Sequence, residues 1–278
     1  MPAPTSASAS ASASASAPAS GPATAPAPAP SVVSVSVAVL RAEARLFARE
    51  PGAWFWIVLF PTALLTVLGL VPAFREPSKD LGGLRVVDLY VPVALLLSTI
   101  TAGVQSMPNV LTGYRERGIL RRLSTTPARP VALLLSQVVL HGAAVLVSAV
   151  LALAVGRLAF GVALPRQPLG YAVAFVLAAL AALATGTVIA ALSRTVKIAA
   201  AFGTIVFFPT MFSAGVWAPV QTMPQTLQTI VQATPLGAAA RALGQAAAGD
   251  WPDWTLLGVS ALWAVVLIAV SARWFRWE

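Results

Sequence analysis

The chain has 278 residues, of which 58% are hydrophobic and only 10% are charged. A soluble domain carries about 25% charged residues to cover its surface, so this composition excludes a soluble protein and predicts a membrane-embedded one. The net charge of +9 is also typical of nucleic-acid-binding proteins. However, the Lys and Arg residues are divided among loops at helix ends, which favours a topological role over a nucleic-acid partner. The absence of cysteine and the single histidine exclude disulfides, cysteine nucleophiles and multi-histidine metal sites, and no cofactor is expected in this chain.

Residues 1–30 consist of Ala, Ser, Pro, Thr and Gly after the initiator Met. Such a segment has no large side chains to bury, so it cannot offset the entropy of ordering its backbone. We expect a disordered cytoplasmic tail without a function of its own, and a tether is the alternative.

Residues 31–53 have the pattern of an amphipathic helix. Arg41, Arg45 and Arg49 recur at every fourth position and form one stripe, while Leu40 and Phe47 belong to an apolar face. This pattern is typical of a helix that lies at the membrane interface with its arginines toward anionic lipid headgroups. The alternation of Val and Ser at its start would also suit a strand.

Six apolar stretches follow, each close to the ~20 residues that cross a bilayer. They are roughly Trp54–Leu70, Leu89–Val110, Val131–Gly156, Gly170–Leu192, Ile198–Trp217 and Trp254–Ala272. The predicted fold class is therefore an all-α polytopic membrane protein with six transmembrane helices. With both termini in the cytoplasm, the inner segments hold twelve Lys and Arg residues and the outer segments hold six. The positive-inside rule favours this orientation in the plasma membrane.

The segment between the fifth and sixth spans is too long for a simple turn. Within Pro219–Asp253, residues 225–232 form an amphipathic stretch, and an Ala-rich stretch after Thr234 ends at Gly249. We expect two short helices that form a re-entrant or interfacial hairpin on the outer side, because irregular backbone at membrane depth needs cover from protein or water.

The predicted spans contain none of the nine acidic residues. Ion-driven carriers usually keep a carboxylate within the membrane to bind the coupling ion. Secondary transport is therefore disfavoured, although backbone carbonyls can also bind sodium. The sequence has no P-loop and no motif of an intramembrane hydrolase. Any ATP hydrolysis that drives this protein must take place on another polypeptide.

The charged loop between the second and third spans is the main indication of function, since five arginines and one glutamate lie between Tyr114 and Pro130. From Arg115 to Pro127 it reads Arg-Glu-Arg-Gly-Ile-Leu-Arg-Arg-Leu-Ser-Thr-Thr-Pro. A second motif consists of Phe208-Pro209, Ser213-Ala214-Gly215-Val216, Pro219, Met223-Pro224, Thr234-Pro235-Leu236 and Arg241-Ala242-Leu243.

These motifs resemble those of the permease subunits of ABC-2 type exporters, in particular the daunorubicin-resistance exporters of actinobacteria. The loop is similar to the family's Arg-Glu-x-Gly-Thr-Leu-x-x-Leu-x-x-Thr-Pro element, with Ile119 in place of Thr. The resemblance covers roughly residues 40–275 and makes residues 54–278 a six-span permease domain. It implies an ATP-driven exporter with two permease chains, identical or related, and two copies of a separate ABC ATPase that binds ATP and Mg²⁺. We expect the cargo to be an amphiphilic or apolar compound such as a drug, an antibiotic or a lipid-like molecule.

The resemblance also implies that a short helix from Glu116 to Leu123 is a cytoplasmic coupling helix that docks in a cleft on the ATPase. Gly118 permits a turn of the backbone, and Leu120 offers, with Leu123, an apolar edge to the partner. The residues expected to couple to the ATPase are Arg115, Glu116, Arg117, Gly118, Leu120, Arg121, Arg122, Leu123, Thr126 and Pro127. The alternative is a basic loop that sets topology and binds lipid headgroups.

Two stripes of polar residues lie within the spans. Ser98, Thr101 and Gln105 form one in the second span, and Gln137 and His141 form another in the third. Such stripes face protein or water rather than lipid, so we expect them at the permease dimer interface or along the transport pathway. For His141, a hydrogen bond to a neighbouring helix is the alternative to contact with cargo or a gating role.

Phe208-Pro209 lies in the outer half of the fifth span. Proline removes one hydrogen bond from a helix and kinks it, so this dipeptide is expected to bend the span. A hinge for an outer gate and a passive bend are both open at this point.

Two functions from other classes are alternatives to the exporter. An ion-coupled secondary carrier would transport its substrate without an ATPase. A non-transporting membrane scaffold or immunity protein would use the basic loop to recruit a soluble partner.

Overall fold

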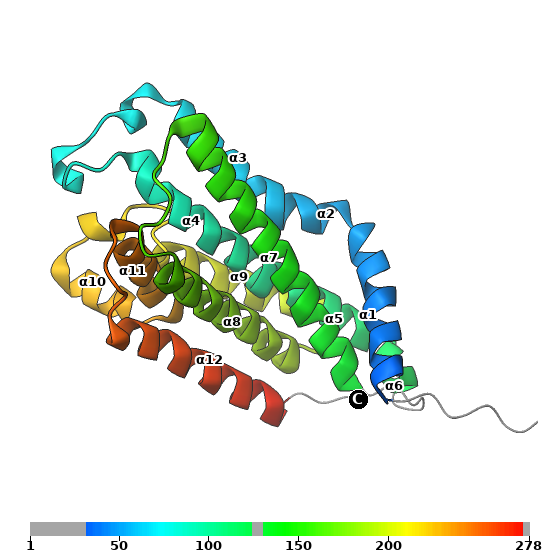
Figure 1. Cartoon of the computed structure of the whole chain (residues 1–278). Helices are drawn as coiled ribbons and strands as arrows, with labels where there is room; N and C mark the ends of the chain where they lie inside the picture. The colour runs from blue at the N-terminus through cyan, green and yellow to red at the C-terminus, as the bar shows by residue number, and fades with distance from the viewer. Residues whose placement is uncertain (1–31, 124–129, 275–278) are drawn as a thin grey trace, which may run out of the picture. The chain divides into compact units, whose positions relative to one another are not determined.

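The computed structural model describes residues 32–123 and 130–274, and its regular elements are helices (Figure 1). The expected tail, residues 1–30, lies outside the described residues, as do Thr126 and Pro127 of the charged loop.

Within residues 32–123 and 130–274, six helices are long and apolar enough to cross a membrane, which confirms the predicted fold class. The first span consists of α2 (Pro51–Trp54), the π-helical segment η1 (Phe55–Leu59) and α3 (Phe60–Leu70), and the second of α4 (Val86–Ile100), the π-helical segment η4 (Thr101–Ser106) and α5 (Met107–Glu116). The other four are α7 (Pro130–Phe160), α8 (Pro168–Leu192), α9 (Val196–Ser213) and α12 (Trp254–Trp274).

The short helices lie at the two ends of the spans (Figure 1). At one end, here called the basic end, are α1 (Val32–Ala48), α6 (Ile119–Leu123) and the turn between α8 and α9. At the other end, here called the hairpin end, are α10 (Gln225–Gln232), α11 (Pro235–Ala248) and the short 3₁₀ helices η2 (Pro72–Arg75), η3 (Lys79–Leu81) and η5 (Val220–Thr222).

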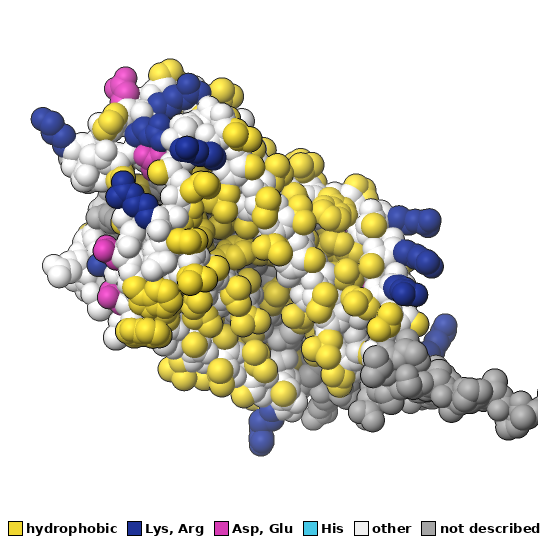
Figure 2. All heavy atoms as spheres, in the orientation of Figure 1, with side chains coloured by type: hydrophobic (Ala, Val, Ile, Leu, Met, Phe, Trp, Pro, Cys, Tyr) yellow, Lys and Arg dark blue, Asp and Glu magenta, His cyan; other side chains and the backbone are white. Residues whose placement is uncertain are grey.

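Figure 2 shows hydrophobic side chains covering the middle of one face, with charged side chains at its two ends. On this face, Lys and Arg are seen at both ends, and acidic side chains are seen only toward the hairpin end. An apolar band between charged ends is the surface that a bilayer requires.

The predicted helical hairpin is present, and it is packed into the protein. Leu236 and Leu243 of α11 are 1% and 0% exposed, and α11 packs against α8 and α12. The indole Nε1 of Trp263 on α12 donates to the carbonyl of Ala233, at the junction of α10 and α11, over 2.9 Å. These contacts fix the hairpin to the last span.

Both π-helical segments are followed closely by a proline. Pro61 comes just after η1 and Pro108 just after η4. A proline ring inside a helix clashes with the carbonyl four residues earlier and donates no hydrogen bond. One extra residue in the turn gives the ring room, so the chain stays helical through the membrane as a π-bulge.

Glycines allow the backbones of the second, fourth and fifth spans to approach closely. A Cβ atom added at Gly186 of α8 would collide with the carbonyl oxygen of Gly103 in η4. A Cβ added at Gly203 of α9 would lie 2.9 Å from the carbonyl oxygen of Val104. Small residues at such crossings are typical of membrane helices, whose association depends on close packing.

Two predicted boundaries are wrong. The second span runs from Val86 to Glu116, so Asp88 and Glu116 lie at its ends and the spans are not free of acidic residues. The amphipathic helix ends at Ala48, and residues 51–53 begin the first span. The second span continues beyond its apolar part, because polar residues at the interface extend a span as well as apolar ones do. The amphipathic helix ends before Pro51, because proline is favoured at the start of a new helix and disfavoured inside one.

Candidate functional site: the groove and loop at the basic end

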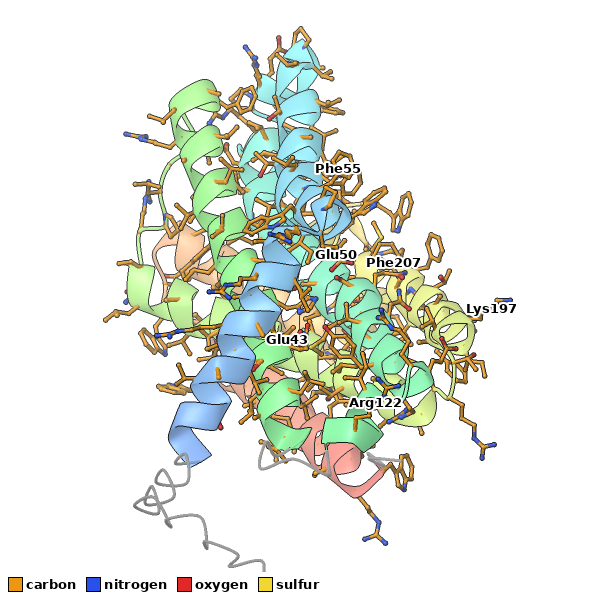
Figure 3. All side chains as sticks on the ribbon, turned by 90° about the vertical axis from the view of Figure 1, so that its right-hand side faces the viewer. Glu43, Glu50, Phe55, Arg122, Lys197 and Phe207 are labelled. Carbon is orange, nitrogen blue, oxygen red and sulfur yellow. The ribbon has the colours of Figure 1, made fainter. Side chains whose placement is uncertain are left out.

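A large open groove lies at the basic end, between α1 and α2 on one side, η4 and α5 behind, and α9 on the other side. Its volume is about 1110 Å³. Figure 3 shows Glu50, which precedes α2, and Phe207 of α9, both of which line it. We call this cavity the basic-end groove.

The part of the groove nearer the membrane centre combines aromatic and neutral polar groups. Trp56 and Phe207 supply apolar surface, and Thr101, Gln105 and Asn109 supply hydrogen-bonding groups. The amide nitrogen of Asn109 donates to the carbonyl of Gln105 over 2.7 Å. Among the described residues no donor reaches the buried Oδ1 atom of Asn109. A buried polar atom without a partner costs free energy, so the amide of Asn109 is held against the groove wall by its one donated bond to Gln105.

Charged side chains line the mouth of the groove. Arg49 and Glu50 belong to the segment between α1 and α2, and Glu116 and Arg117 belong to the end of α5. The groove therefore changes from apolar and neutral to charged along its length. This arrangement suits a molecule with an apolar body and a polar or charged head.

A buried carboxylate joins the amphipathic helix to two spans beside the groove. Glu43 of α1 is 8% exposed, and its Oε2 atom accepts hydrogen bonds from Tyr114 Oη over 2.6 Å and from Gln137 Nε2 over 2.7 Å. Burial raises the pKa of Glu43 above its usual 4.5, because it disfavours the charged form more than the two hydrogen bonds favour it. Glu43 is labelled in Figure 3.

His141 is fully buried and lies one helical turn from Gln137. Its Nδ1 atom is 2.9 Å from the carbonyl of Gln137, and its Nε2 atom is 3.1 Å from Ser106 Oγ in η4. The ring of Phe47 contacts the imidazole edge-to-face at 5.1 Å between centroids. The histidine therefore bonds to a neighbouring helix, as the second of the two hypotheses describes. Neither Gln137 nor His141 lines the groove.

The stripe on the second span divides between the groove and the interior. Thr101 and Gln105 line the groove, while Ser98 is fully buried and donates to the carbonyl of Leu95 over 2.7 Å. That Thr101 and Gln105 lie along the transport pathway stays a prediction, and their place in the wall of the groove supports it.

The loop after the second span begins later than predicted. Glu116 ends α5, Gly118 has a φ of +67°, and α6 begins only at Ile119. A φ of this sign is strained for residues with a Cβ, so glycine is needed at this turn. Of the predicted coupling residues, the side chains of Arg121 and Leu123 lie outside the described part of the structure.

Leu120 differs from its predicted placement. It is 1% exposed and packs in a small apolar cluster with Tyr114 and Leu133. It therefore does not present an apolar edge to a partner, because its side chain stabilises the position of α6 on its own chain. Arg122 on the same helix is exposed, as Figure 3 shows.

Arg115 and Glu116 contact the turn between α8 and α9. Arg115 Nη1 donates to the carbonyls of Ala190 over 2.7 Å and Ser193 over 2.6 Å. Glu116 Oε1 accepts from the backbone N–H of Val196 over 2.9 Å. The two residues that begin the charged motif thus bind elements of the same chain.

Phe208 and Pro209 lie on α9, which continues as a helix through Pro209 to Ser213. Phe208 is 51% exposed and shares an exposed apolar face of α9 with Phe202, Ile205 and Phe212. The proposed hinge at Pro209 stays a prediction.

Sequence reasoning missed Glu43, Trp56 and Asn109. Glu43 had a signal, because it is an acid on the apolar face of an otherwise arginine-striped helix. Asn109 also had one, because it lies four residues after Gln105 and extends the polar stripe by one turn. Trp56 lies near the start of the first span, where tryptophan is common at the membrane interface, and nothing in the sequence distinguishes such a residue from one that lines a groove.

The family model that matches this chain is described as "ABC-2 type transporter" and covers residues 36–246. A search of curated proteins found no match. The matched range contains α1 through most of α11, with the basic-end groove and the charged loop, and it extends over more than half of the sequence. The chain therefore belongs to the ABC-2 type transporter family, as a membrane-spanning component.

Proposed function

We propose that this chain is the permease subunit of an ATP-driven exporter that moves an amphiphilic or apolar compound out of the cytoplasm or the inner leaflet. Two such chains, identical or related, would enclose the pathway, and two copies of a separate ABC ATPase would bind ATP and Mg²⁺. Membership of the ABC-2 family supports an ABC ATPase as partner.

The observation that carries the proposal is the basic-end groove itself. It offers aromatic surface from Trp56 and Phe207, neutral hydrogen-bonding groups, and a charged mouth beside the loop that leads to α6. Lys and Arg gather at this end, which supports a cytoplasmic location for it. A groove that is apolar inside and charged at a cytoplasmic mouth would take up amphiphiles from the inner side.

Coupling to the ATPase is assigned to α6. Gly118 turns the chain so that α6 projects at the end of the second span, and Leu120 anchors it on Tyr114 and Leu133. Arg122 is exposed on this helix, and the positive charge of the loop would be complementary to acidic groups on the ATPase. Closure of two ATPases on ATP would press on α6 and move the helices that surround the groove.

The exposed face of α9 is assigned to the second permease chain. Only 22% of the apolar window of this span is buried within one chain, against 72% for the second span. A second copy that covers Phe202, Ile205 and Phe208 would close the open side of the groove.

The experiment that tests this function is purification of the full chain with co-expressed ATPase candidates from its own genome, followed by reconstitution in liposomes. We expect one ATPase to co-purify, and its activity to fall when Gly118 is replaced by proline. Proline cannot adopt the φ of +67° at this position. Gly118→Ala is the matched control, because alanine tolerates the conformation at a cost of about 1–2 kcal/mol.

Two outcomes would refute the proposal. Transport by the chain alone, driven by an ion gradient, would make it a secondary carrier. A well-folded chain that binds no ATPase and transports nothing would favour a scaffold or immunity protein.

A further inference from the structure

The last two residues of α5 bind both helix ends at the turn between the fourth and fifth spans. Arg115 donates to the carbonyls of Ala190 and Ser193 at the end of α8. Glu116 accepts from the N–H of Val196, the first residue of α9. We call this pair of contacts the strap.

The charges of the strap match the helix ends that they bind. The last carbonyls of a helix have no partner within it and carry partial negative charge, which suits the Arg115 guanidinium at the end of α8. The first N–H groups carry partial positive charge, which suits the Glu116 carboxylate at the start of α9. An exchange of the two residues would place each charge at the unfavourable end.

The strap connects the loop of α6 to a wall of the groove. Its residues are separated from α6 only by Arg117 and Gly118, and Leu120 of α6 packs on Tyr114 of α5. On the other side, Val196 and Phe207 of α9 line the groove. A displacement of α6 can therefore reach α9 through α5 and the hydrogen bonds of the strap.

We propose that Arg115 and Glu116 are positioning residues that carry the movement of α6 to α9, so that closure of the ATPase changes the width of the basic-end groove. This inference rests on the proposed function, and it assigns the two residues to transmission within the chain instead of to docking on the ATPase.

The structure offers a variant that removes the donor of the strap without harming the helix. Val196→Pro deletes the N–H that Glu116 binds, and proline is favoured at the first position of a helix. The preceding residue, Thr195, has φ −130° and ψ 154°, the extended conformation that proline requires of its predecessor. Val196→Ala is the matched control, because it shortens the side chain and keeps the N–H.

Glu116→Ala removes the acceptor of the same bond, and Glu116→Gln keeps an oxygen that can accept it. If the bond is the transmitting element, Glu116→Ala and Val196→Pro have the same effect, and the double variant has no larger effect than either alone. In Glu116→Gln and Val196→Ala, which keep the bond, we expect the nucleotide-dependent change in groove width to be retained.

The groove width is measured by double electron–electron resonance (DEER). Arg45 of α1 and Lys197 of α9 are replaced by cysteine, and each introduced cysteine is spin-labelled. Both side chains are exposed, and the sequence contains no cysteine, so only the two introduced thiols are labelled. The full chain is reconstituted with its co-purified ATPase and diluted with unlabelled protein to isolate distances within one chain. Spectra are recorded without nucleotide and after trapping with ATP and vanadate, which requires no knowledge of the cargo.

In the wild type we expect the label distance to change on trapping. In Glu116→Ala and Val196→Pro we expect this change to fall about fivefold, while ATP hydrolysis continues. If both variants show the same change in label distance as the wild type, the strap does not transmit the movement, and the proposed function stays intact. An equal loss in Val196→Ala would also overturn the strap, because the side chain and not the N–H would then be responsible. If the wild type binds no ATPase or shows no change, the proposed function fails and the inference fails with it.

Discussion

Replacement of Glu43 by alanine is expected to destabilise the fold, because this side chain joins α1 to two spans. The carboxylate accepts the hydrogen bonds of Tyr114 Oη and Gln137 Nε2, whose residues are 8% and 2% exposed. An alanine leaves both donors buried without a partner. Each such loss costs about 1–3 kcal/mol, so we expect a loss of about 2–6 kcal/mol in the free energy of unfolding.

Glu43→Gln separates the hydrogen bonds from the charge. Its amide oxygen still accepts from Tyr114 and Gln137, and no charge has to be buried. We therefore expect the glutamine variant to remain within about 1 kcal/mol of the wild type.

We also expect the stability of the wild type and of Glu43→Gln to depend differently on pH. Because burial raises the pKa of Glu43 above 4.5, the folded chain holds this proton more tightly than the unfolded chain does. The wild type should therefore lose stability as the pH rises from about 4.5 through the raised pKa. The glutamine variant lacks this loss, since it has no proton to release.

The assay is equilibrium unfolding of the purified chain in mixed micelles, followed by circular dichroism at several pH values. Tyr114→Phe alone and together with Glu43→Ala completes a double-mutant cycle for the shorter of the two bonds. The reasoning is refuted if Glu43→Ala has the same free energy of unfolding as the wild type at every pH. It is also refuted if wild type and Glu43→Gln show the same pH profile.

Three further outcomes follow from the packing of the spans. Gly186→Ala forces a Cβ into the carbonyl of Gly103, so we expect a loss of roughly 1–3 kcal/mol in the free energy of unfolding, and unchanged thermal stability by circular dichroism would contradict the close crossing. Arg85→Ala removes the bond to the carbonyl of Phe160 at the end of α7, which should cost about 1 kcal/mol in the same measurement; no change in hydrogen exchange at that helix end would argue against it. Trp263→Phe keeps the aromatic ring and loses the bond to the hairpin, and we expect faster proteolysis between α10 and α11, with an unaltered cleavage pattern as the contrary result.

The membrane spans were predictable because their signal is simple. Each is a long apolar stretch, and the loops that separate them carry charge or proline. The positions of the ends were less certain, since Asp88 and Glu116 sit in helical turns that the apolar pattern does not mark. The hairpin between α9 and α12 was also predictable, because residues 225–232 alternate polar and apolar side chains with helical spacing.

The π-helical segments could not be placed from local propensity. Pro61 and Pro108 mark the relevant turns, but a proline in a span is equally compatible with a kink, a helix end or a bulge. The choice depends on which neighbouring backbone fills the space, and that is decided by packing between spans.

The candidate site was predictable only in part. Thr101 and Gln105 follow helical spacing and line the groove as a stripe should. Leu120 has the same spacing from Leu123 that an exposed apolar edge would have, yet its side chain is buried on Tyr114. Whether such a side chain faces a partner or its own chain depends on the direction that Gly118 gives to α6, and a single glycine does not specify it.

The crossing of Gly103, Gly186 and Gly203 has a mechanical consequence. Where side chains interlock, a helix that rotates must first lift its knobs out of the holes of its neighbour. At these glycines, backbone atoms of the second, fourth and fifth spans lie directly against one another. The glycine contacts themselves hold no side chain that must leave a neighbouring helix, so they oppose a rotation of the fifth span less than an interlocked contact would.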